Sequence, residues 1–226
     1  MIGANIALFA VALLLDPAAA GFTMNPLGLF RPSDRALFAL GATGTIPIDG
    51  YGRLWTLLSA GYLHAGLLHI VFNLAALRQL GLLVGREYGT SRMFVIYTLA
   101  GVCGFIASWA VGVRFTVGAS AGVCGLVGAI LYYGKSRGGS YGAALYRQVG
   151  TWVLVLFLFG FLVPGINNWA HGGGLLAGAL AGKILGYTER RREGTLHRAL
   201  AAVLLALTVG VLLIALGHGL SARFIR

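Results

Sequence analysis

Seven apolar segments, each nearly free of charged residues, constrain the fold of this chain more than any other feature of its sequence. A helix that spans a lipid bilayer needs about 20 mostly apolar residues. The segments run over Ile2–Ala20, Leu63–Val84, Met93–Val113, Ser120–Tyr133, Trp152–Pro164, Trp169–Tyr187 and Leu200–Leu216. The fourth and fifth are short, so we expect both helices to extend further. The pattern predicts an all-α, polytopic membrane protein embedded in the lipid bilayer.

The charge content agrees with a membrane protein. Only 10% of the 226 residues are charged, whereas a soluble domain has roughly 25%. Lys and Arg total 17 against 6 Asp and Glu. No basic patch is interleaved with exposed aromatic residues, so nucleic-acid binding is not expected. The excess of Lys and Arg is better explained by basic residues in cytoplasmic loops. Their distribution along the chain predicts that the N-terminus lies on the cytoplasmic side of the membrane and the C-terminus on the outer side.

These segments divide the chain into three predicted parts. Residues 1–187 would form a core of six spanning helices, 188–199 a basic cytoplasmic loop, and 200–226 an additional C-terminal helix and tail. The first outer connection, 16–60, is long and shows no regular pattern, and such loops are usually functional. Its apolar side chains, Phe22 among them, favour a position partly in the membrane interface. The two cysteines, Cys103 and Cys124, are interpreted as small packing residues.

Polar side chains at membrane depth are costly, and they tend to be functional or paired. They are His64, His69, Asn73, Ser120, Asn167, Asn168 and His171. His69 and Asn73 are four residues apart and share one helix face, whereas His64 points elsewhere. No H-E-x-x-H motif occurs and no acidic residue lies near these histidines, so neither a metal nor another cofactor is expected. A hydrogen-bonded helix contact is the alternative role for His69 and Asn73.

A stripe of small residues predicts which two helices meet. From His171, glycines follow at one helix face as Gly174, Gly178 and Gly182. The fourth segment offers a matching surface of Gly118, Ala121, Gly122, Gly125 and Gly128. Small residues let membrane helices approach closely. Contact between these surfaces would bring Ser120 to His171 at the outer end of both helices. Taken alone, a serine such as Ser120 in a glycine-rich membrane helix is usually a packing residue.

A Ser–His pair would be sufficient for nucleophilic catalysis here. Many serine hydrolases use an Asp to orient the His, but an ionised Asp at membrane depth would cost about 2.5–3.5 kcal/mol. Tight helix packing can orient the imidazole instead. An oxyanion would need hydrogen-bond donors. The Asn73 amide, the His69 ring N–H and the backbone N–H of Ser120 at a helix N-terminus are suitable.

The sequence resembles the rhomboid intramembrane serine proteases, over nearly the whole chain. "GASAGVCGLVGA" looks like the nucleophile motif, "HAGLLHIVFN" like the second-span motif and "NNWAHGGGLLAG" like the histidine motif. The resemblance implies Ser120 as nucleophile, His171 as general base, Asn73 and His69 on the oxyanion side, and a structural role for His64. It implies a six-helix bundle, here with a seventh helix added (6+1), and transmembrane proteins as substrates in a bacterial inner membrane.

The chain departs from the family pattern at a few positions. Trp55 is followed by Thr56 where the family often has arginine, and Ala121 follows the serine where glycine is common. A glutamate common near the end of the second span is replaced by Gly85, with Glu87 nearby. None of these changes removes a catalytic group, so we expect activity. We expect the fifth helix and the "LVPGINNW" connection, broken at Pro164, to gate access.

Two other classes of protein remain as alternatives. A catalytically weak or inactive relative that binds membrane proteins would usually lack the serine or the histidine, and both are present here. A transporter would favour acidic residues at membrane depth or a discontinuous helix in each half, whereas the only acidic residue in the apolar segments is Asp16, near the end of the first. The sequence does not indicate an oligomeric state.

Overall fold

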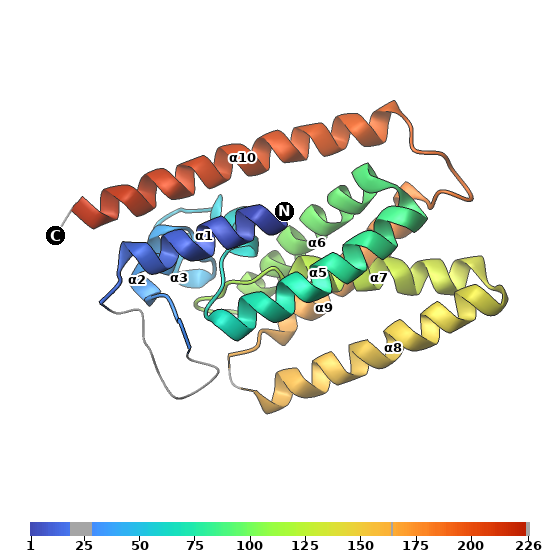
Figure 1. Cartoon of the computed structure of the whole chain (residues 1–226), viewed down its shortest axis with the longest axis horizontal. Helices are drawn as coiled ribbons and strands as arrows, with labels where there is room; N and C mark the ends of the chain where they lie inside the picture. The colour runs from blue at the N-terminus through green and yellow to red at the C-terminus, as the bar shows by residue number, and fades with distance from the viewer. Residues whose placement is uncertain (19–28, 164, 225–226) are drawn as a thin grey trace. The chain divides into compact units, whose positions relative to one another are not determined.

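A computed structural model describes residues 1–18, 29–163 and 165–224. Over these residues the secondary structure is helical, apart from one isolated bridge between Thr43 and Thr116 (Figure 1). The chain divides into two compact units. Unit 1 comprises Met1–Arg78, Gly112–Ala119 and Leu205–Arg226, and unit 2 comprises Gln79–Val111 and Ser120–Leu204.

Each predicted apolar segment coincides with a helix. The helices are α1 (Ile2–Leu15), α5 (Leu67–Tyr88), α6 (Thr90–Ala110), α7 (Ser120–Arg137), α8 (Gly139–Leu162), α9 (Asn168–Leu185) and α10 (Thr195–Phe224). Among the described residues, four helices are long and apolar enough to cross a membrane, namely α5, α6, α8 and residues 195–222 of α10. The prediction of an all-helical, multi-pass membrane protein is therefore confirmed, and the 6+1 arrangement stays a prediction.

Several helices extend beyond the apolar segments that predicted them. α7 continues to Arg137, and α8 begins at Gly139 rather than at Trp152. α10 begins at Thr195, so it takes in part of the predicted loop 188–199. Backbone hydrogen bonding continues a helix past the lipid-facing residues, whereas hydropathy marks only the part that favours lipid. Pro164, the predicted break near the fifth helix, lies outside the described residues.

The first connection in unit 1 contains more regular structure than predicted. It forms the short helices α2 (Asp34–Ala39), α3 (Thr45–Asp49), α4 (Thr56–Ser59) and the 3₁₀ turn η2 (Ala60–Tyr62). Their periodic patterns are too short to detect in a sequence. Ser33 caps α2, because its side chain accepts a hydrogen bond from the Ala36 N–H at 3.1 Å. Phe22 lies outside the described residues.

This connection holds the chain segment that leads into α7. Thr43 and Thr116 exchange backbone hydrogen bonds of 3.0 and 2.8 Å, and the Gly118 N–H donates to the Ala60 carbonyl at 2.9 Å. The C-terminal part of α10 packs on the same connection. There the His218 ring stacks on Trp55, with ring centroids 5.5 Å apart and an interplanar angle of 8°. Unit 1 is therefore organised around the first connection.

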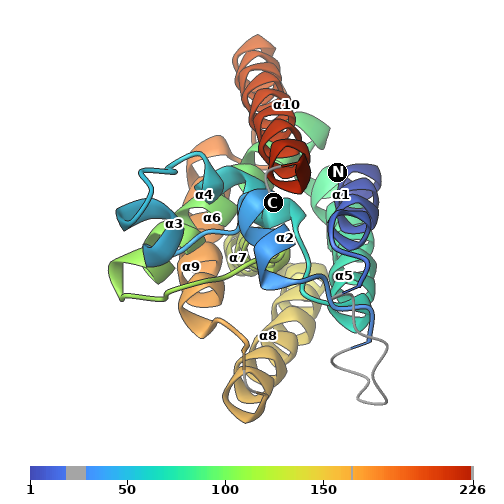
Figure 2. The ribbon, with the colours of Figure 1, turned by 90° about the vertical axis from the view of Figure 1, so that its left-hand side faces the viewer.

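In unit 2, α7 contacts α6, α8 and α9, and α6 also contacts α9 (Figures 1 and 2). Two side chains cap helix ends, where backbone N–H or C=O groups would otherwise have no hydrogen-bond partner. Arg92 is fully buried and donates to the carbonyls of Leu185 and Gly186 at the end of α9. The Glu193 carboxylate accepts from the N–H groups of Ser91 and Arg92, at 2.9 and 3.1 Å, at the start of α6.

Candidate active site

Ser120 and His171 lie together in unit 2. Ser120 is the first residue of α7, and His171 lies in the first turn of α9. The Ser120 Oγ and the His171 Nε2 are 2.8 Å apart, within hydrogen-bond distance. His171 is 5% exposed, and Ser120 is partly exposed. A nucleophile and a base at this distance can transfer the hydroxyl proton to the imidazole. The structure thus brings together the two residues predicted as a catalytic pair.

Direct contact between the backbones of α7 and α9 positions this pair. A Cβ atom added to Gly174 would overlap the Ala121 carbonyl, and one added to Gly178 would overlap the backbone of Gly125. From the other side, a Cβ on Gly128 would overlap the Leu175 carbonyl. Small residues permit this approach between membrane helices. The glycine stripe on α9 therefore sets the separation of the helices that carry Ser120 and His171.

Two glycines of the predicted surface on α7 have other neighbours. A Cβ on Gly122 would lie 2.7 Å from the Tyr97 ring of α6, so this residue faces α6 rather than α9. Gly118 precedes α7 and has a φ of 135°, which side chains rarely adopt. Its place is in the turn held by Ala60. The prediction that Gly122 contributes to the surface facing α9 was wrong, because a helix among several neighbours packs small residues on more than one face. For Gly118, which belongs to unit 1, it stays a prediction.

Asn167 fixes the start of α9. Its side-chain oxygen accepts from the Ala170 N–H at 3.1 Å, and its amide donates to the Ser108 hydroxyl of α6 at 2.6 Å. The first contact caps the helix that carries His171, and the second ties that cap to α6. Asn167 was identified among the polar residues, but Ser108 was missed. A single serine near the end of an apolar segment gives no signal of its own.

Ala121 packs against α6. A Cβ placed on Gly104 would come within 3.0 Å of the Ala121 methyl, so the absent side chain of Gly104 leaves room for that methyl. Ala121 itself is 1% exposed. The alanine that departs from the family pattern is therefore matched by a glycine on the neighbouring helix.

His64, His69 and Asn73 belong to unit 1. His69 Nδ1 accepts a hydrogen bond from the Ala65 N–H at 3.2 Å, which places the ring proton on Nε2 and leaves it as a donor. The Asn73 amide donates to the His69 carbonyl at 2.8 Å and retains a second N–H. His64 is fully buried with its ring 5.1 Å from that of His69. Since Ser120 and His171 belong to unit 2, the oxyanion role of His69 and Asn73 stays a prediction.

Thr56, which stands where the family often has arginine, makes hydrogen bonds within the first connection. The buried Thr56 hydroxyl lies 3.1 Å from the Thr43 hydroxyl, in hydrogen-bond contact, and donates to the Arg53 carbonyl at 2.7 Å. Arg53, two residues before Trp55, donates to the Phe38 carbonyl and lies over the Phe38 ring. These contacts hold the first connection where the family often has an arginine after the tryptophan.

Glu87 makes polar contacts near Gly85. Its carboxylate accepts from the Tyr141 hydroxyl at 2.8 Å, whereas a Cβ on Gly85 would meet nothing within 4 Å.

Within the described ranges, no three His, Cys, Asp or Glu side chains form a group that could hold a metal ion.

Comparison with known proteins identifies a domain family in this chain. Residues 51–188 match the Rhomboid domain. Rhomboid protease GluP of Bacillus subtilis (strain 168) is 39% identical over 166 residues, which cover 71% of this chain and 32% of that protein. RHOMBOID-like protein 7 of Arabidopsis thaliana is 32% identical over 166 residues, covering 73% of this chain and 52% of that protein.

A further relative bears on activity. Inactive RHOMBOID-like protein 8 of Arabidopsis thaliana is 31% identical over 157 residues, covering 68% of this chain and 44% of that protein. The chain spans between about a third and about half of the length of these curated relatives. Because the domain match covers more than half of the chain and includes both Ser120 and His171, this chain is a member of the rhomboid family.

Proposed function

We propose that this protein is an intramembrane serine endopeptidase that cleaves transmembrane segments with a Ser120–His171 dyad. The observation that carries the proposal is the 2.8 Å separation of Ser120 Oγ and His171 Nε2 in a rhomboid-family chain. Both side chains are uncharged before reaction, so the pair avoids the cost of a buried ion. Substrates would be membrane proteins whose helix unwinds near the outer face of the bilayer.

The reaction begins with the Ser120 hydroxyl. Nε2 of His171 accepts the hydroxyl proton as Oγ attacks the peptide carbonyl, and the resulting tetrahedral oxyanion is stabilised by hydrogen-bond donors. The Ser120 N–H is one such donor, because the first N–H groups of α7 have no partner within the helix. We propose the His69 Nε2–H and the remaining Asn73 N–H as the other two, on the resemblance of "HAGLLHIVFN" to the second-span motif of the family. His171 then returns the proton to the leaving amine, and water hydrolyses the acyl-enzyme.

The alternative is a family member that binds membrane proteins without cleaving them, because one of the related proteins carries the description inactive. Both reacting side chains are present here and in contact, which favours the enzyme. We further propose a bacterial plasma membrane location, with α8 and the connection before α9 as the elements that admit substrate.

Reconstituted full-length protein tests the dyad. We expect wild type to cleave a single-span model substrate, and Ser120→Ala and His171→Ala to lose at least about 10³-fold in rate. Ser140→Ala removes an exposed serine of α8 and serves as the matched control, with activity unchanged. Cleavage by Ser120→Ala at the wild-type rate would contradict the proposal.

A fluorophosphonate probe separates an inactive protein from an unsuitable substrate. An activated serine reacts with such a probe without any peptide, so wild type and Ser140→Ala should be labelled, and Ser120→Ala and His171→Ala should not. Failure of wild type to label or to cleave would favour the binding protein.

A further inference from the structure

The Asn168 carboxamide has an unsatisfied oxygen close to the proposed catalytic pair. Its Oδ1 is shielded from solvent and has no hydrogen-bond partner in the part of the chain that the structure describes. A buried acceptor without a partner costs free energy, so such groups are rare in folded proteins. The neighbouring Asn167 differs, since its oxygen accepts from the Ala170 N–H and its amide donates to the Ser108 hydroxyl. Asn167 is therefore engaged in holding the fold, whereas Asn168 keeps an acceptor for another molecule.

The position of Asn168 on α9 relates it to the general base. Asn168 begins α9 and precedes His171 by three residues, a spacing that makes two side chains neighbours on the helix surface. The rise of a helix places Asn168 about 4.5 Å nearer to the predicted outer end of α9 than His171. An extended peptide covers about 3.3 Å per residue. A substrate residue one or two positions from the scissile bond would therefore come within reach of Asn168.

Gly160 of α8 holds the carboxamide in place. A Cβ added to Gly160 would overlap Oδ1 of Asn168 and would lie 2.7 Å from its Cγ and 2.9 Å from its Nδ2. The carboxamide thus lies directly against the bare backbone of α8. One turn further along α9, a Cβ on Gly172 would lie 3.8 Å from the Phe157 ring of α8. The outer part of α8 therefore covers Asn168.

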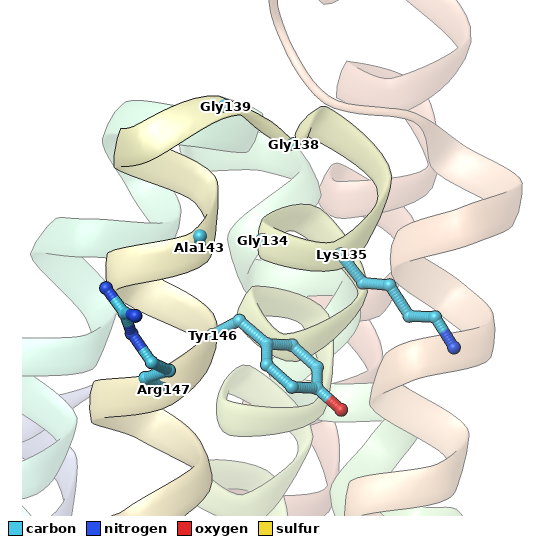
Figure 3. Close-up of a pocket in the computed structure, with 7 residues that line it drawn as sticks. All are labelled: Gly134, Lys135, Gly138, Gly139, Ala143, Tyr146 and Arg147. Carbon is cyan, nitrogen blue, oxygen red and sulfur yellow. The ribbon is translucent and has the colours of Figure 1, made fainter.

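α8 is attached more closely to its neighbour at the other end. Figure 3 shows its first turns joined to α7 through Gly138 and Gly139, beside an open hollow lined mostly by exposed side chains. Under this turn the two backbones touch, since a Cβ on Gly134 would lie 2.7 Å from the Gly142 carbonyl oxygen. Gly160 lies about 27 Å further along α8 than Gly142. A movement of the outer part of α8 away from Asn168 therefore leaves this attachment in place.

An unwound peptide has the groups that complement a carboxamide. Within a helix the backbone N–H and C=O groups bond to one another, and unwinding frees both. Water is scarce at membrane depth, so the freed groups need partners from the protein. A carboxamide presents an oxygen acceptor and N–H donors in one plane, which match the N–H and C=O of a peptide. It does so without a charge, which would be costly in the membrane.

We propose that the Asn168 carboxamide binds the backbone of the unwound substrate next to the scissile bond, with Oδ1 accepting a hydrogen bond from a substrate N–H. The inference rests on the proposed function, because it needs a peptide bound at Ser120 and His171. Without substrate, Gly160 covers the carboxamide, and displacement of the outer part of α8 uncovers it. Asn168 is then a substrate-binding residue that takes no part in the proton transfer.

Cleavage kinetics of the full-length protein with a single-span peptide substrate test the hydrogen bond. Asn168→Leu retains the approximate size of the side chain and removes its hydrogen-bonding groups. We expect KM to rise about tenfold and kcat to change less than about twofold, because the contact is made equally in the bound substrate and in the transition state. Labelling by a fluorophosphonate needs no peptide, so Asn168→Leu should be labelled at the wild-type rate.

The two readouts separate this inference from the proposed function. Asn168→Leu with the KM of wild type would overturn the inference alone. An equal loss of labelling and of cleavage in Asn168→Leu would also overturn it, because the residue would then support the catalytic pair rather than the substrate. A wild-type protein that neither labels nor cleaves would refute the proposed function and this inference with it.

Ester substrates locate the hydrogen bond. An ester oxygen in place of one backbone N–H, introduced in turn at each position within about three residues of the scissile bond, removes a single donor. At one position we expect wild type to lose about tenfold in kcat/KM and Asn168→Leu to lose less than about twofold, because the variant has no acceptor for that N–H. Equal losses in the two proteins at every position would overturn the proposal.

A variant of α8 tests how the carboxamide is held. Gly160→Ala places a methyl group where the carboxamide lies, so the Asn168 side chain must turn away, and KM should again rise about tenfold. Gly150→Ala is the matched control on the same helix, because its Cβ would meet nothing within 4 Å, and it should retain the wild-type KM. The same KM in both variants would overturn the role given to Gly160.

Discussion

α7 and α8 are neighbours in sequence and in space, yet their surroundings differ. Every residue of α7 from Ala121 to Ile130 is buried. On α8, by contrast, Leu154, Leu158 and Phe161 are 66%, 63% and 79% exposed. The contacts of α7 with α9 are between backbones, so its position relative to α9 has little freedom. The apolar half of α8 meets few protein neighbours.

The difference suggests separate roles: α7 holds the proposed catalytic residues in place, and α8 adjusts to let a substrate in. α7 carries the proposed nucleophile and is held by glycines that leave no space for movement toward α9. α8 touches α7 closely at Gly134 and Gly142, near its own start, while its apolar half faces outward. We therefore expect α8 to shift for a substrate helix while Ser120 and His171 stay in contact. The following substitutions test this contrast.

The largest effect is expected at Gly178. Gly178→Ala would place a methyl group inside the backbone of Gly125 and should lower the free energy of unfolding by about 3 kcal/mol. Cleavage should fall as well, because separation of α7 from α9 parts Ser120 from His171. Thermal unfolding and cleavage in the same detergent measure both. Gly172→Ala is the control on the same helix, where the added Cβ would lie 3.8 Å from Phe157, and equal loss in the two variants would contradict the interpretation.

Asn167→Ala should have the next largest effect, a loss of about 1–2 kcal/mol, because it removes the cap of α9 and the contact with Ser108. His171, in the first turn, should be held less well, so the cleavage rate should also fall. Asn167→Ser retains a capping oxygen and should recover most of the stability. If Asn167→Ala cleaves as fast as wild type at full stability, Asn167 does not position the histidine.

Ala121→Gly tests whether the methyl group serves packing or limits catalysis. Because this methyl lies against Gly104, its removal should cost about 1 kcal/mol of stability. The cleavage rate per folded molecule should be unchanged. Ala129→Gly, at another buried position of α7, provides the matched stability loss. A higher rate in Ala121→Gly alone would show instead that the methyl crowds the reacting groups.

The smallest effect is expected for Leu158→Ala on α8, within about 0.5 kcal/mol of wild type, because this side chain already faces outward. The same truncation on α7, Leu126→Ala, should cost about 3 kcal/mol, since Leu126 is fully buried. Chemical unfolding of both variants in one detergent gives the comparison. Similar losses would mean that α8 is as tightly packed as α7.

The sequence predicted the helices and the Ser–His pair because both leave strong local signals. Long apolar runs reflect the lipid environment, and a serine and a histidine at membrane depth are rare enough to stand out. The glycine stripe of α9 was also predictable, because its spacing is that of residues on one helix face. Membership of the rhomboid family, predicted from three motifs, is confirmed by the domain match.

Features that depend on tertiary contacts were not predicted. Ser108 matters only because Asn167 lies opposite it, and Gly122 faces α6 because Tyr97 lies there. The short helices of the first connection depend on pairs such as Thr43 with Thr116, which are far apart in sequence. The sequence predicted that α8 extends beyond Trp152–Pro164, but not that it starts at Gly139, because its first turns are polar. Each case involves a partner that hydropathy and periodicity do not identify.

The buried Arg92 and the Glu193 carboxylate impose a length constraint on the connection between α9 and α10. Arg92 closes the end of α9, and Glu193, eight residues beyond Leu185, closes the start of α6. An insertion between Leu185 and Glu193 would have to be looped out completely to keep both contacts. Natural relatives that retain both the arginine and the glutamate should therefore keep the length of the α9–α10 connection and vary in the length of other loops. In a relative that lacks one of the two residues, we expect the other to be substituted as well.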